Sequence, residues 1–83
     1  MKRITEVELY GALDTLNTLL REPTNAGEIG SYYLYKQPPG WQLQRTMNKS
    51  GGFEEITQGY LPKRLMYERI WGMIAGIRIV NTE

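Results

Sequence analysis

The sequence predicts one α+β domain of two layers, in which a three-stranded antiparallel sheet packs against two helices in the order α-β-β-β-α. Three observations predict this class. Apolar residues recur at intervals of three and four near both ends of the chain, and they alternate with polar ones in the middle. Glycine and proline separate the alternating segments. A length of 83 residues suits a single domain over residues 1–83.

The first helix is predicted over residues 6–21, ahead of Pro23, which disfavours helical geometry in the residue before it. Thr5 and Glu8 have the spacing of a capping box, in which each side chain satisfies a free backbone N–H. The apolar stripe consists of Leu9, Leu13, Leu16 and Leu20. We expect four polar side chains to face solvent: Glu6, Asp14, Asn17 and Arg21. A polar loop follows over residues 22–30.

Three strands are predicted over residues 31–36, 41–47 and 53–58, with turns at 37–40 and 48–52 between them. The middle strand alternates, so it divides into two sets of side chains. One face carries Trp41, Leu43 and Met47, and the other carries Gln42, Gln44 and Thr46. Arg45 is the exception, because it is a cation on the apolar face. The third strand is the weakest, and we expect it at an edge of the sheet.

The second helix is predicted to begin with Pro62 at its first position, where the missing N–H is not needed. Its apolar stripe comprises Met66, Ile70, Met73, Ile74 and Ile77. Residues 77–80 either extend this helix or add a short strand. Both helices are expected on one face of the sheet, which leaves the other face open.

Composition excludes several kinds of chemistry. The chain has no His and no Cys, so acid–base catalysis near neutral pH and a zinc site both lack their usual residues. Glu54 and Glu55 are neighbours and point to opposite faces of a strand, so they cannot act as a catalytic pair. We therefore expect no enzyme activity, metal or cofactor. No apolar run reaches the length of a membrane span, and we expect a soluble, cytoplasmic protein.

Candidate binding residues gather at the start of the second helix: Tyr60, Lys63, Arg64 and Tyr67. A helix N-terminus carries partial positive charge, so cations there oppose the dipole. Lys63 and Arg64 would suit binding of a phosphate or a partner's carboxylate, with the tyrosines stacking on a base or peptide. The alternative is that both cations project into solvent.

Arg45, Trp41 and the tyrosines of the first strand form a second candidate group. Arg45 either pairs with a carboxylate, Glu55 or Glu68, or lies beside Trp41 in a cation–aromatic recognition surface. Tyr32 or Tyr33, together with Tyr35, either forms a stacking platform or completes the core or a dimer interface. The net charge of +1 argues against binding of long nucleic acids.

The pattern of an aromatic strand, Trp41–Met47, the Gly51-Gly52 turn, Gly59–Arg64 and Tyr67–Ile70 resembles small open reading frames of tailed phages and prophages. The resemblance covers about residues 31–78 and carries no assigned activity. It implies a virus-encoded accessory protein made in a bacterial cytoplasm.

Accessory proteins of this kind are often inhibitors of host defence. The resemblance therefore implies a binding protein that blocks a host defence protein, as anti-CRISPR proteins do, or sequesters a cyclic or other signalling nucleotide. A nucleotide sponge is expected to be a homo-oligomer, because one small chain offers little concave volume. A structural phage component and a small DNA-binding regulator are the alternatives.

Overall fold

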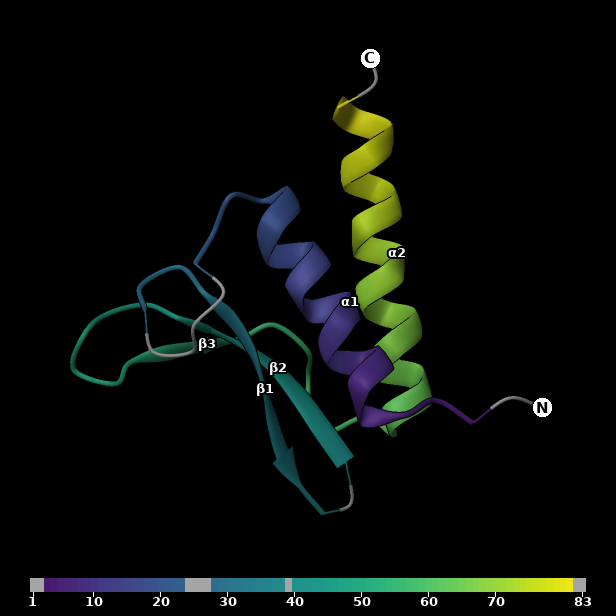
Figure 1. Cartoon of the computed structure of the whole chain (residues 1–83). Coiled ribbons are helices and arrows are strands. Elements are labelled where there is room, and N and C mark those ends of the chain that lie inside the picture. Colours follow the sequence, from purple (N-terminus) through teal and green to yellow (C-terminus); the bar gives the residue numbers. More distant parts are fainter. Residues whose placement is uncertain (1–2, 24–27, 39, 82–83) are drawn as a thin grey trace.

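A computed structural model describes residues 3–23, 28–38 and 40–81 (Figure 1). Its elements follow in the order α1 (Glu6–Leu19), β1 (Tyr32–Gln37), β2 (Gly40–Thr46), β3 (Phe53–Glu55) and α2 (Lys63–Asn81). This order and the antiparallel sheet confirm the predicted fold class. Residues 24–27 of the predicted loop and Pro39 of the predicted turn lie outside the described residues.

Capping interactions set both ends of α1. The Thr5 hydroxyl accepts a hydrogen bond from the Glu8 N–H at 3.1 Å, which confirms the predicted start. The helix ends two residues earlier than predicted, because Arg21 adopts a left-handed conformation with φ of 58°. The N–H groups of Arg21 and Glu22 then donate to the carbonyls of Thr18 and Asn17, in the pattern of a Schellman motif.

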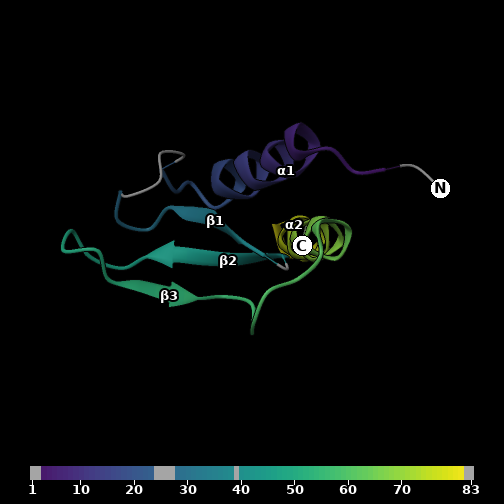
Figure 2. The same ribbon diagram turned by 90° about the horizontal axis from the view of Figure 1, so that it is seen from below.

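The strands lie in the order β1-β2-β3, and both pairs are antiparallel. The register places Leu34 opposite Leu43 and Tyr33 opposite Gln44. Because side chains alternate along a strand, these two pairs lie on opposite faces. We call the face that carries Leu34 and Leu43 the helix face, because both helices pack against it, and we call the other one the open face. Figure 2 shows α1 beside β1 and α2 end-on beside β2.

β3 is shorter than predicted and ends at Glu55. The N–H groups of Ile56 and Thr57 both lie within hydrogen-bonding distance of the Leu43 carbonyl, at 2.8 and 3.4 Å. Two residues of one strand segment therefore oppose one residue of β2, as in a β-bulge, and regular pairing stops there. The chain rejoins β2 at Leu61, which forms an antiparallel bridge with Trp41.

α2 begins at Lys63, one residue after the predicted start, and the Pro62 carbonyl accepts the Met66 N–H. The helix continues to Asn81, so residues 77–80 extend it and add no strand. The core lies between the two helices and the helix face. Its fully buried side chains are Leu9, Leu16, Leu43, Met66, Ile70 and Ile74.

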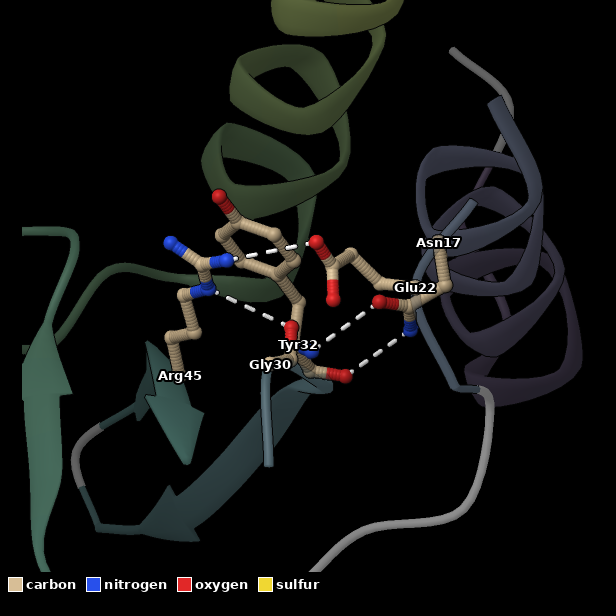
Figure 3. A network of polar contacts seen from close by, with 5 residues as sticks. All are labelled: Asn17, Glu22, Gly30, Tyr32 and Arg45. Carbon is tan, nitrogen blue, oxygen red and sulfur yellow. Dashed lines mark hydrogen bonds and ion pairs between the residues drawn. The ribbon is translucent and has the colours of Figure 1, made fainter. Parts of the chain in front are cut away.

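Two expectations about individual side chains are wrong. Met47 is half-exposed, because β2 ends at Thr46 and Met47 no longer belongs to the helix face. Asn17 is 1% exposed, although we expected it to face solvent. Its side chain donates to the Tyr32 carbonyl and accepts from the Tyr32 N–H, both at 2.9 Å (Figure 3). The Asn17 amide thus satisfies the free edge of β1 at Tyr32, where a further strand would otherwise pair.

Candidate functional site

The structure separates the eight candidate binding residues into three groups. Those on the helix face are Trp41 and Arg45. Those on α2 are Lys63, Arg64 and Tyr67. Those on or beside the open face are Tyr33, Tyr35 and Tyr60. The predicted residues therefore do not form one site, and the third group lines a hollow of the surface.

On the helix face, Arg45 pairs with a different carboxylate from those predicted. Its guanidinium donates to Glu22 Oε1 at 3.3 Å and to the Gly30 carbonyl at 3.2 Å (Figure 3). Neither Glu55 nor Glu68 is its partner, because Glu55 lies on the open face and Glu68 pairs with Arg64. The aromatic ring beneath Arg45 belongs to Tyr32, at 5.2 Å from the ring centroid.

Trp41 is a core residue. It is 4% exposed and makes an edge-to-face contact with Tyr10, with ring centroids 5.9 Å apart. The cation over its ring is Lys36, whose ammonium lies 5.2 Å from the centroid. The predicted surface of Arg45 beside Trp41 is therefore not formed.

The two cations at the start of α2 both have carboxylates nearby. Arg64 pairs with Glu68 one turn later, at 3.3 Å. The Glu6 carboxylate forms an ion pair with Lys36 at 2.7 Å and also experiences the charge of Lys63. The Lys36 hydrogen bond and charge, with a smaller contribution from Lys63, lower the pKa of Glu6. These carboxylates offset the charge that an anion site would use.

Tyr67 packs partly buried against the core, in edge contact with Trp71 at 6.3 Å. The Tyr67 ring is therefore engaged in contacts within the fold. The cluster predicted around the start of α2 does not converge on a single ligand-sized space.

The open face carries a shallow hollow of about 350 Å³. The register explains its composition. Tyr33 and Tyr35 of β1 lie opposite Gln44 and Gln42 of β2, and Gln44 lies opposite Glu55 of β3. The remaining lining residues are Gln37, Phe53 and Tyr60. Three strands and the segment after β3 therefore supply one surface, which neither helix covers.

The floor of the hollow is a chain of amide hydrogen bonds. Gln42 and Gln44 are each only 4% exposed, although they lie on the uncovered face. Gln42 Nε2 donates to Glu55 Oε2 at 2.8 Å, and Gln44 Nε2 donates to Gln42 Oε1 at 2.6 Å. Because an ionised carboxylate can only accept, Glu55 fixes the orientation of both amides. The floor is therefore rigid and polar.

Aromatic side chains form the walls. Tyr35 and Tyr60 lie with ring centroids 6.3 Å apart, and the Tyr60 hydroxyl donates to Gln37 Oε1 at 3.2 Å. Phe53 is 51% exposed, and Tyr35 is 46% exposed. On the same face, burial raises the pKa of the Tyr33 hydroxyl. An exposed Phe beside tyrosines on a flat sheet is typical of a surface that binds another molecule.

Sequence reasoning identified three lining residues and missed Gln42, Gln44, Phe53, Glu55 and Gln37. A usable signal was present, since the alternation of the middle strand already placed Gln42 and Gln44 opposite the core. Pairing the strands across the turn at 37–40 would have placed both glutamines beside Tyr33 and Tyr35. The local sequence does not show that flanking side chains bury the two amides.

The lining residues of the hollow offer one carboxylate, three amides and four aromatic rings. The one carboxylate in the hollow, Glu55, faces amides and aromatic rings, with no nucleophile and base in contact among the lining residues. Within residues 3–23, 28–38 and 40–81, no group of three potential ligands could hold a metal ion. In the same ranges, every helix is too short or too polar to cross a membrane. Comparison with protein-family models, curated proteins and solved structures finds no match to this chain.

Proposed function

We propose that this chain is a binding protein that blocks a protein partner with the open face of its sheet. The observation that carries the proposal is the hollow itself, in which exposed Phe53 and Tyr35 surround two buried, oriented amides. Aromatic residues are enriched at the energetic centres of protein interfaces, and rigid polar groups beside them provide specificity. The resemblance to tailed-phage accessory proteins supports a bacterial defence protein as the target.

Charge favours a protein over a signalling nucleotide as the ligand. A nucleotide carries phosphates, which require cations. Among the described residues, the hollow is lined by one carboxylate, Glu55, and by no cation. None of the three cations expected to bind phosphate, Arg45, Lys63 and Arg64, lines the hollow. Arg45 pairs with Glu22, and Arg64 pairs with Glu68 on α2, where Lys63 also lies. These contacts support the protein-blocking mechanism against the nucleotide sponge.

Surface variants test the proposal. Phe53→Ser on the open face and Leu65→Ser on α2 remove side chains of equal exposure, 51% each, from different surfaces. The wild-type chain and both variants are used to capture a partner from bacterial lysate, and affinities are then measured with the purified partner. We expect Phe53→Ser to weaken binding about tenfold or more, and Leu65→Ser to leave it unchanged.

Two results would contradict the proposal. In the first, the partner binds both variants with wild-type affinity. In the second, a cyclic di- or trinucleotide raises the melting temperature of the chain, and the double change Lys63→Ala/Arg64→Ala removes that increase. The second result would instead indicate that the chain is a nucleotide sponge with its binding site at the start of α2.

A further inference from the structure

We propose that the hollow on the open face receives an arginine side chain of the partner protein. This inference rests on the proposed function and names the chemistry that the open face recognises. It is argued from the charge of the lining residues, from the direction of the hydrogen bonds in the floor and from the aromatic walls.

The lining residues give the hollow a negative character. Glu55 is the one ionised side chain among the eight residues that line it. The nearest cations along the strands, Lys36 and Arg45, lie opposite Trp41 and Glu54 in the register and so belong to the helix face. A cationic group would therefore find a carboxylate without a competing cation from the same face.

The hydrogen-bond chain leaves the floor rich in acceptors. Gln42 Nε2 donates to Glu55 Oε2 and lies 3.4 Å from the Thr57 carbonyl, so both of its N–H groups are directed into the fold. Gln44 Nε2 donates to Gln42 Oε1. Three of the four N–H groups of these amides therefore have acceptors within the chain, whereas Glu55 Oε1 accepts no hydrogen bond from the described residues. A ligand that fits this floor must bring donors.

The aromatic walls favour a planar cation over a spherical one. A guanidinium stacks on aromatic rings and donates in its own plane, whereas an ammonium is strongly hydrated and donates as a point charge. Tyr33, Tyr35 and Tyr60 supply aromatic rings in the same hollow as the carboxylate, and Phe53 supplies apolar surface for the methylene stem. Stacking on a tyrosine while donating to Glu55 uses both properties of arginine.

A peptide titration tests this inference on the full chain. The probe is acetyl-Gly-Arg-Gly-amide, and the readout is the ¹⁵N side-chain amide signals of Gln42 and Gln44 in a labelled sample. We expect these signals to shift and saturate with the arginine peptide. The lysine analogue is expected to bind several-fold more weakly, and the citrulline analogue, which has the same shape without the charge, is expected to cause no saturable shift.

Two variants of β3 provide a matched pair. Glu55→Gln removes the charge from the hollow, whereas Glu54→Gln makes the same change on the neighbouring residue, which faces the other way. We expect Glu55→Gln to weaken arginine-peptide binding about tenfold and Glu54→Gln to change it less than about twofold. Backbone amide spectra of each variant confirm that the sheet is intact.

The inference is overturned if the citrulline peptide binds as well as the arginine peptide, or if both variants weaken binding equally. It is also overturned if Phe53→Ser releases the partner while the arginine peptide shifts no signal, a result that would leave the proposed function standing. A saturable arginine response together with wild-type partner binding by Phe53→Ser would refute the proposed function alone.

Discussion

Replacing Asn17 with alanine should strongly destabilise the fold, because this one side chain makes two hydrogen bonds to the edge of β1. Both bonds, to the Tyr32 carbonyl and from the Tyr32 N–H, are 2.9 Å long, and Asn17 is 1% exposed. Leaving a buried polar group without its partner costs about 1–3 kcal/mol. With two backbone groups affected, and some water entering the vacated space, we expect a loss of about 2–4 kcal/mol.

That loss is a large share of the roughly 4–12 kcal/mol expected for a domain of this size. It corresponds to a drop in melting temperature of about 10–25 °C. The loss in unfolding free energy is measured by urea unfolding followed by tryptophan fluorescence, since the buried Trp41 becomes exposed. Asp14→Ala, at an exposed position of the same helix, should change the unfolding free energy by less than about 0.5 kcal/mol.

Asn17→Asp separates the two hydrogen bonds. An ionised aspartate still accepts from the Tyr32 N–H, but it faces the Tyr32 carbonyl without a proton to donate. Burial raises the pKa of such a carboxyl, so the folded state binds more protons than the unfolded state. The stability of this variant should therefore rise as pH falls toward 4. The proposed role of this side chain would be refuted if Asn17→Ala lost less than about 1 kcal/mol of unfolding free energy, or if the stability of Asn17→Asp did not change with pH.

Three further predictions concern other contacts. Gly40→Ala should cost about 2–3 kcal/mol, because the new Cβ would lie 2.5 Å from the Leu61 carbonyl oxygen, which the bridge to β2 holds in place. Glu6→Gln should lower the free energy of unfolding near neutral pH, because it removes the ion pair between Glu6 and Lys36. This pair lowers the pKa of Glu6 and raises the pKa of Lys36. The difference in unfolding free energy between the wild type and Glu6→Gln should vanish as pH falls through the lowered pKa of Glu6, and also as pH rises through the raised pKa of Lys36. Tyr33 should ionise above the ordinary tyrosine pKa of about 10, measured by absorbance as the difference from Tyr33→Phe.

Each of these predictions has a control or an outcome that would contradict it. Gly11→Ala, in open space on α1, should stabilise by about 0.5–1 kcal/mol, and an equal gain for Gly40→Ala would refute the close approach. For Glu6→Gln the control is Asp14→Asn, which makes the same charge change on the same helix. If the effect of Glu6→Gln on stability persisted at pH 2, the ion pair with Lys36 would be excluded as its cause. For Tyr33, a difference titration with its midpoint at or below the ordinary tyrosine pKa would contradict the effect of burial.

The predicted sites failed where they depended on partners distant in the sequence. Arg45 was correctly recognised as a cation that needs a carboxylate, but Glu22 lies 23 residues away across a loop, and only packing brings the two together. Trp41 was placed on the apolar face, yet whether that face is buried or binds a ligand depends on where the helices lie. Tyr33 and Tyr35 were predicted either as a stacking platform or as part of the core or a dimer interface, without the glutamines that lie opposite them on β2.

What the sequence determined by itself is the set of local features. Periodicity fixed the order of helices and strands, Thr5 marked the start of α1, and the alternation of β2 assigned its side chains to two faces. The absence of His and Cys removed imidazole and thiolate from the groups available for catalysis or metal binding.

The tertiary structure alone decided which polar groups meet. Asn17 became the cap of a strand edge, and Gln42, Gln44 and Glu55 became one oriented network. The physical reason is that periodicity depends on neighbours within a few residues, whereas a buried polar group needs a partner in space, and that partner is selected by how helices and strands pack.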